Sequence, residues 1–328
     1  MSIAKQIARK VVFPLVVGTG LEKAFKFFSP AKKQILLYHG VVNSPKHDIS
    51  VGPISSDSFE KQIKYLRDNF DVVTQEEIFQ MYRDDYTPKK HTVAITFDDG
   101  YANNYSIAYP IMKKYNVPST MYILSQCLED NERLTWSDYI DFVKDKLDLH
   151  KISSLNSSIN NIPALKDFIK GLTIEQRNKL FTELNKQVNV QSNPLYFEPE
   201  HWRLMNTAQI KELAESGLVE IGAHSHNHPN LGRIDINEAK NEMKTSKDLL
   251  ESVINKKIHS IAFPDGCYTK EVKQAALDLG YKNLLAVDYK LQEDKEDKNI
   301  LSRYCISSTT TVESNIFNIN KSFKQYGF

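Results

Sequence analysis

Short apolar runs alternate with helical patterns along most of this chain. The clearest strand pattern covers His91 to Phe97, and Gln34 to Tyr38 predicts another buried strand near the start. Between these strands Asp57 is expected to cap one helix, and Thr74, with Glu77 three residues later, has the spacing of a capping box that starts the next. The pattern between Gln34 and Phe97 therefore predicts strands that alternate with helices.

The same alternation returns in the second half of the chain. Helices are expected at 207–216, 236–253 and 269–279, and strands at 218–221, 259–263 and 281–287. Strands that alternate with helices form a parallel sheet with the helices outside it, which is the α/β class. The number of units suits a barrel at least as well as an open sheet.

Two segments depart from this alternation. Residues 129–205 carry mostly helical patterns, which predicts an insertion beside the main domain (31–328) or over its rim. Residues 1–30 begin with a basic stretch and continue with an apolar run of eight residues, too short to span a bilayer. We expect a helical segment packed on the domain, with peripheral contact to a membrane surface as the alternative. Because no clear cleavable signal is seen, a cytoplasmic or peripheral membrane location is favoured.

Composition and charge narrow the function classes. The 328 residues are 41% hydrophobic and 25% charged, as in a soluble globular protein. The 42 basic and 41 acidic side chains create no overall field toward nucleic acid, so no nucleic-acid partner is expected. The three cysteines are widely separated, which argues against a thiolate zinc site and a disulfide framework. The oligomeric state stays open.

Two polar motifs follow predicted strands. Asp98 and Asp99 come directly after the strand at 91–97, at the end where α/β folds build their active sites. His224 and His228 follow a later strand and are four residues apart, so their imidazoles can share one side of a turn, while His226 between them points elsewhere. Two imidazoles and one carboxylate make a three-ligand metal site with an open position.

A third motif is the strand and turn Ile261-Ala262-Phe263-Pro264-Asp265-Gly266. Alone it indicates only a sharp turn at the end of a strand, and it becomes informative because it follows the other two motifs along the chain. Together with Thr96-Phe97-Asp98-Asp99-Gly100-Tyr101 and His224-Ser225-His226-Asn227-His228, it resembles the polysaccharide deacetylase (NodB-homology) family of carbohydrate esterases. The resemblance covers roughly residues 34 to 305 apart from the insertion. It implies a distorted (β/α) barrel of about seven strands.

The resemblance also implies roles for individual residues. Asp98 would be the general base, and Asp99, His224 and His228 would bind a divalent metal ion, most simply zinc. The backbone N–H of Tyr101 is a candidate for holding the oxyanion.

The family's usual C-terminal general-acid histidine is absent, because no histidine follows His259. The segment Leu36-Leu37-Tyr38-His39-Gly40-Val41, however, resembles the opening of biofilm-type poly-N-acetylglucosamine deacetylases, whose barrel is circularly permuted. His39 is therefore proposed as the general acid, with a strand-end histidine satisfied by backbone as the alternative. The third motif also lacks the family's arginine and carries Asp265 in place of its aromatic residue, so we name Arg303 as a substitute.

These observations predict a metal-dependent hydrolase that removes acetyl groups from an N-acetylhexosamine-containing polysaccharide or glycan intermediate. Two alternatives remain open at this point. A related metal amidohydrolase acting on a small amide or a formyl-sugar would use the same ligands. A catalytically inactive glycan-binding barrel would explain the missing arginine and C-terminal histidine.

Overall fold

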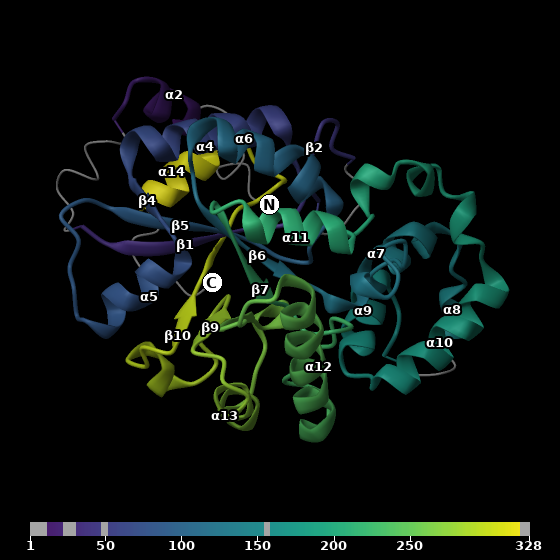
Figure 1. Cartoon of the computed structure of the whole chain (residues 1–328). Coiled ribbons are helices and arrows are strands. Elements are labelled where there is room, and N and C mark those ends of the chain that lie inside the picture. The colour runs from purple at the N-terminus through teal and green to yellow at the C-terminus, as the bar shows by residue number, and fades with distance from the viewer. Residues whose placement is uncertain (1–11, 22–30, 47–51, 154–157, 322–328) are drawn as a thin grey trace.

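A parallel sheet curled into a barrel forms the centre of the molecule in the computed structural model, which describes residues 12–21, 31–46, 52–153 and 158–321 (Figure 1). Within these residues nine strands belong to the sheet, and every pairing between them is parallel. They are β1 (Lys33–Tyr38), β4 (Asp71–Val73), β5 (Thr92–Phe97), β6 (Ser119–Ile123), β7 (Val219–Ala223), β8 (Ser260–Ala262), β9 (Asn283–Ala286), β10 (Ile300–Ser302) and β11 (Tyr304–Cys305).

The last strand closes the barrel. β10 pairs with β9, and after a break of one residue, Arg303, β11 pairs with β1. The order around the barrel is β1, β5, β6, β7, β8, β9 and the broken β10/β11, while β4 adds only to the start of β5. The predicted distorted (β/α) barrel of about seven strands is confirmed.

Helices cover the outside of the barrel where the helical patterns predicted them (Figure 1). Thr74 and Glu77 form the expected capping box, whereas Ser55, not Asp57, caps the preceding helix by accepting a hydrogen bond from the Ser58 N–H. The covering helices are α4 (Ser56–Asn69), α6 (Tyr109–Tyr115), α11 (Thr207–Glu215), α12 (Ile236–Ile254) and α13 (Lys270–Asp278), while α5 (Gln75–Arg83) packs against the barrel interior. A π-helical turn at Asn104–Ala108 precedes α6, and a two-stranded sheet pairs β2 (Val41–Val42) with β3 (Ile54–Ser55).

The barrel interior is filled by side chains that alternate along the strands. Ile35, Ala94 and Tyr122 pack there with two residues of α5, which covers the amino-terminal mouth. Tyr122 leaves no room for a side chain on the neighbouring strand, because a Cβ at Gly222 would lie 2.4 Å from its ring. The functional residues are therefore confined to the opposite mouth, at the carboxyl ends of the strands.

The insertion folds as a helical unit with its own apolar core, and Figure 1 shows it gathered at one end of the molecule. Trp136, Ile140, Leu165 and Leu184 are buried in that core. The helices are α7 (Trp136–Val143), α8 (Leu149–Ser153), α9 (Ile162–Lys170) and α10 (Ile174–Gln187). They are followed by the 3₁₀ turns Val190–Ser192, Pro194–Phe197 and Pro199–His201. The predicted helical insertion thus has enough apolar surface to fold against itself and against the barrel.

The described part of the amino-terminal segment is a short helix, α2 (Phe13–Gly18), which packs on the last helix, α14 (Val312–Lys321). The rings of Phe13 and Phe317 stack with centroids 4.2 Å apart, while Leu15 is 65% exposed. The rest of the predicted 1–30 segment lies outside the described residues. Among the residues described, no helix is long and apolar enough to cross a bilayer.

Candidate active site

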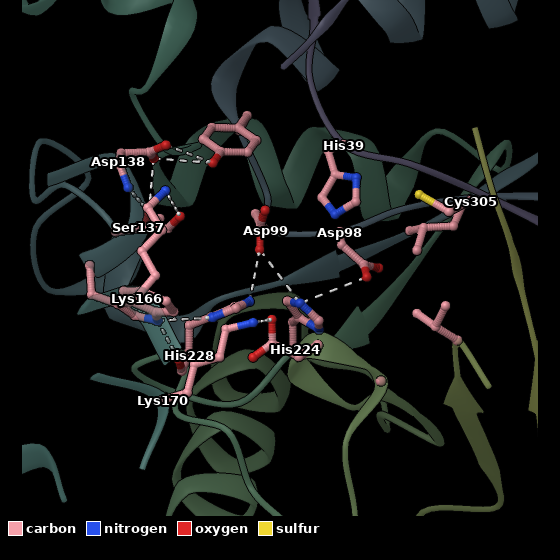
Figure 2. A pocket seen from close by; sticks show the side chains of 17 residues that line it. His39, Asp98, Asp99, Ser137, Asp138, Lys166, Lys170, His224, His228 and Cys305 are labelled. Carbon is pink, nitrogen blue, oxygen red and sulfur yellow. Dashed lines mark hydrogen bonds and ion pairs between the residues drawn. The ribbon is translucent and has the colours of Figure 1, made fainter. Parts of the chain in front are cut away.

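A cavity of about 310 Å³ opens at the carboxyl ends of the barrel strands, and the predicted site residues line it (Figure 2). His39 follows β1, Asp98 and Asp99 follow β5, and His224 follows β7, while His228 comes from the loop after β7. Carboxyl ends of parallel strands meet at one mouth of a barrel, which explains why residues so distant in sequence gather here.

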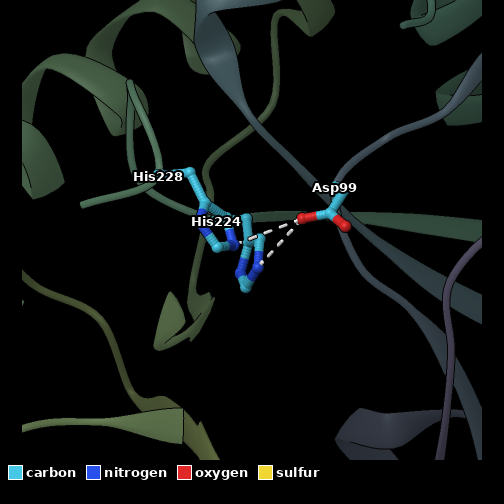
Figure 3. A group of neighbouring side chains, drawn as sticks. All are labelled: Asp99, His224 and His228. Carbon is cyan, nitrogen blue, oxygen red and sulfur yellow. Dashed lines mark ion pairs between the residues drawn. The ribbon is translucent and has the colours of Figure 1, made fainter. Parts of the chain in front are cut away.

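Asp99, His224 and His228 form a compact three-ligand group (Figure 3). The Asp99 Oδ1 atom lies 3.5 Å from Nε2 of His224 and 3.4 Å from Nε2 of His228, and the three candidate ligand atoms are all within 4.8 Å of one another. Asp99 and His228 both adopt left-handed backbone angles, with φ of 70° and 55°. Such angles are costly for residues with side chains and gather at functional sites, where surrounding contacts enforce them.

The imidazole of His224 is oriented by its other ring nitrogen. Nδ1 of His224 lies 2.8 Å from the carbonyl oxygen of Ala262, which leaves its Nε2 facing Asp99. Burial lowers the pKa of His224, and burial followed by the nearby His224 lowers the pKa of His228 to about 3. Both rings are therefore neutral near neutral pH, the form in which histidine binds a metal ion.

The carboxylate of Asp99 is destabilised in its charged form, and a bound cation would stabilise it. Burial raises its pKa well above the usual range, and the neighbouring carboxylates of Asp98, Asp138 and Asp265 raise it further. A divalent cation between this carboxylate and two neutral imidazoles would offset the repulsion, and the donor set fits zinc. The residues present thus fit a metal ion.

Asp98 is held as a buried carboxylate by Arg303. Nη1 of Arg303 donates to Oδ1 of Asp98 at 2.6 Å and Nη2 donates to Oδ2 at 2.7 Å, in a bidentate pair. Burial alone would raise the pKa of Asp98, but Arg303, followed by His224, lowers it to about 2. Oδ2 of Asp98 is also 3.8 Å from Nε2 of His224, so an ionised carboxylate stands beside the metal-ligand group.

The sequence around these residues matches a known protein family. The family model described as polysaccharide deacetylase matches residues 85–284, more than half of the chain. The chain belongs to the polysaccharide deacetylase family.

Individual relatives of this chain are distant. The YxkH protein of Bacillus subtilis (strain 168) is 24% identical over 254 residues, which cover 77% of this chain and 63% of that protein. A poly-beta-1,6-N-acetyl-D-glucosamine N-deacetylase of Staphylococcus aureus (strain MRSA252) is 26% identical over 53% of this chain and 62% of its own length. The chain thus spans less than two thirds of the length of these relatives.

Solved structures share the fold. The deacetylase PplD of Streptococcus pyogenes, solved in complex with acetate, superposes with a TM-score of 0.57 at 21% identity, covering 88% of this chain and 98% of that one. IcaB from Ammonifex degensii gives a TM-score of 0.59 at 17% identity, covering 89% and 98%. At these identities the likeness establishes the barrel architecture alone.

His39 lines the same cavity as Asp98 and Cys305, and all three are labelled in Figure 2. Burial lowers the pKa of His39 to about 4, although the charge of Asp98 acts to raise it. The structure brings this predicted residue to the cavity with a neutral ring.

Tyr101 also reaches the cavity, with its side chain engaged elsewhere. Its hydroxyl donates to the Asp138 carboxylate at 3.1 Å. The flanking backbone groups are hydrogen-bonded, because the Ala102 N–H donates to the Arg203 carbonyl and the Gly100 carbonyl accepts from the Met205 N–H. The N–H of Tyr101 donates to no acceptor among the described residues. That N–H is thus available for the oxyanion role predicted for it.

His226 points away from the cavity as predicted. Its Nδ1 lies 2.8 Å from Ser125 Oγ, and its Nε2 lies 3.5 Å from Glu129. Buried Glu242 accepts hydrogen bonds from the backbone N–H groups of His226 and Asn227 and so fixes the loop that carries both candidate histidine ligands.

The sequence reading missed one whole wall of the site, which the insertion supplies. Asp138 follows the start of α7, and burial raises its pKa to about 7. Lys170 at the end of α9 forms an ion pair of 2.8 Å with Asp265, and Trp136 Nε1 donates to the His228 carbonyl at 2.8 Å. Because these contacts join segments far apart in the sequence, no local pattern could have identified them, although the family departure at Asp265 marked one partner.

Proposed function

We propose that this chain is a metal-dependent N-deacetylase that acts on a polysaccharide or glycan containing N-acetylhexosamine. The observation that carries the proposal is an ionised, arginine-held Asp98 placed 3.8 Å from a ligand of the Asp99–His224–His228 group. Membership of the polysaccharide deacetylase family supports the reaction class. The N-deacetylase from Staphylococcus aureus supports an N-acetylglucosamine polymer as the substrate class.

Asp99, His224 and His228 would hold the metal ion, which when bound supplies Lewis acidity at the acetyl carbonyl. Asp98 accepts the proton of the attacking water, because its carboxylate is ionised and held in one orientation by Arg303. The N–H of Tyr101 donates to the oxygen on which negative charge develops.

His39 donates a proton to the leaving amine, which is a poor leaving group unless protonated. Since the ring of His39 is neutral in the resting site, the proton that it donates is the one that Asp98 has taken from the attacking water, which passes to His39 before the amine leaves. The products are acetate and a free amine on the sugar.

Of the two alternatives, the inactive glycan-binding barrel loses much of its support. It rested partly on the arginine missing from the third motif, and Arg303 supplies a guanidinium at Asp98 from the last strand. A small amide or formyl-sugar as substrate is distinguished by product analysis on N-acetylated oligosaccharides and small amides.

Two substitutions test the proposal directly. Asp99→Ala should abolish metal binding, whereas Asp98→Asn should bind metal and lose acetate release, because only the first removes a ligand. Metal content is measured by elemental analysis and turnover by acetate release from β-1,6-linked N-acetylglucosamine oligomers, with exposed Asp57→Asn as the matched control. Full activity of Asp98→Asn would show that the base is assigned wrongly.

A further inference from the structure

A second cavity of about 290 Å³ lies between the insertion and the barrel rim, and no step of the proposed reaction uses it. Its wall includes Tyr139 from α7, Asn178 and Phe181 from α10, and Tyr196 from a following 3₁₀ turn. Its volume is close to the 310 Å³ of the first cavity, so both accommodate a unit of similar size.

The two cavities are neighbours because Trp136 lines both. Its neighbours in the sequence also line one cavity or the other. Arg133 and Leu134 line the second cavity, and Thr135 and Asp138 line the first. Trp136 is 6% exposed and is held by its hydrogen bond to the His228 carbonyl, so both cavities share one fixed side chain next to the metal-ligand group.

The wall of the second cavity has the chemistry of a sugar site. Aromatic rings offer flat apolar faces to the C–H groups of a pyranose. Tyr139 and Phe181 stack on each other with centroids 4.6 Å apart and half-buried Tyr196 stacks on Trp202, which leaves one face of each ring for a ligand. Amide side chains both donate and accept hydrogen bonds, as hydroxyl groups require, and Asn178 and Asn185 stand exposed at the opening.

We propose that this second cavity binds the sugar unit next to the one being deacetylated, on the same glycan chain. The inference rests on the proposed function and extends it, since the protein then recognises at least two consecutive units and binds oligosaccharides more tightly than a single N-acetylhexosamine.

The experiment compares binding of the N-acetylglucosamine monomer and the β-1,6-linked tetramer by calorimetry, using the full metal-loaded chain with Asp98→Asn to prevent turnover. Asn178→Trp, added to this background, fills the cavity from an exposed position of α10, and Glu183→Trp places the same ring on the opposite face of the helix as the control. Asn178→Trp should weaken tetramer binding about tenfold, the effect of losing one or two net hydrogen bonds, while Glu183→Trp leaves it unchanged.

Unchanged tetramer affinity in folded Asn178→Trp, or equal affinities of the parent for monomer and tetramer, would overturn the inference. If Asn178→Trp does not fold by circular dichroism, the milder pair Arg133→Ala and Asn178→Ala replaces it, with weaker tetramer binding expected and unchanged binding again overturning the inference.

Acetate release by the wild type separates the two proposals. Release from the tetramer with no effect of the cavity variants on binding keeps the function and rejects the second site. Variant-sensitive tetramer binding without acetate release keeps the site and rejects the function.

Discussion

At the scale of single residues, the pairing of Asp98 with Arg303 sets the charge of the site. Both side chains are almost fully buried, at 4% and 0% exposure, and a buried carboxylate without a partner would lose its charge. The guanidinium arrives from the break between β10 and β11, a position that the third motif of the sequence does not include. Arg303 is therefore a positioning residue that keeps Asp98, the proposed base, ionised.

Arg303→Lys should lower kcat by roughly 10- to 100-fold, because a lysine cannot form the bidentate pair that orients Asp98. The pKa of Asp98 should rise as the guanidinium is lost, so the acidic limb of the kcat/KM profile moves to higher pH. Steady-state acetate release across pH 4 to 8 measures both effects, because the pKa of Asp98 of about 2 lies below this range in the wild type and a raised pKa moves the limb toward it. Exposed Arg67→Lys is the control. An acidic limb at its wild-type position would show that Arg303 does not tune this carboxylate.

The metal-free protein should lose stability as pH falls from about 6.5 toward 4. The pKa of His39 is about 4 in the folded state, below its ordinary value of 6.5, so the unfolded chain binds the extra proton in this window. His39→Gln should reduce the loss, and exposed His150→Gln should not. Melting temperatures in chelator at pH 7 and pH 5 give the measurement, and identical slopes for the wild type and His39→Gln would contradict the buried, neutral state of His39.

A site residue could be predicted from the sequence where it lies in a short motif with other site residues. Asp98 and Asp99, and likewise His224 and His228, each share one short motif, and the strand pattern around them indicates which mouth of the barrel they occupy. Arg303 could be named only as a substitute, because its contact with Asp98 spans more than two hundred residues.

At the scale of elements, the insertion builds a wall of the active site as well as a subdomain of its own. α7 starts at Trp136, whose indole N–H donates to the carbonyl of His228, a residue with left-handed backbone angles. The helical periodicity of residues 129–205 predicted the helices, but not which of their faces meets the cavity. That choice depends on non-local contacts such as Lys170 with Asp265 and Arg177 with the Asn227 carbonyl.

Trp136→Phe should weaken metal affinity about tenfold, because groups that support a metal ligand tune the affinity of the site. The ring is retained, so the apolar core of the insertion is disturbed little. The chain's other tryptophan provides the matched control, since Trp202 Nε1 donates to the Tyr196 carbonyl, away from the ligands. Zinc affinity is measured for both variants by calorimetric titration. Equal zinc affinities of the Trp136 and Trp202 variants would mean that the insertion does not support the His228 loop.

At the scale of the whole molecule, the barrel is closed by one broken strand, and the candidate metal ligands come from strands that are not adjacent. Asp99 follows β5, while His224 and His228 follow β7, with β6 between them. A metal ion held by all three therefore ties two separate parts of the barrel mouth together. It also offsets the repulsion that Asp98, Asp138 and Asp265 exert on Asp99 in its absence.

Zinc should accordingly raise the melting temperature of the whole chain. Binding to the folded state alone contributes about 2.7 kcal/mol when free metal exceeds its Kd by about 100-fold. Scanning calorimetry with zinc and with chelator measures the shift, and Asp99→Ala should show none, because a ligand from the β5 end is lost. A wild-type shift equal to that of Asp99→Ala would place any bound zinc elsewhere. A shift that disappears in Asp99→Ala and in His224→Ala alike would mean that one ion joins the ends of β5 and β7, as the hydrolytic site requires.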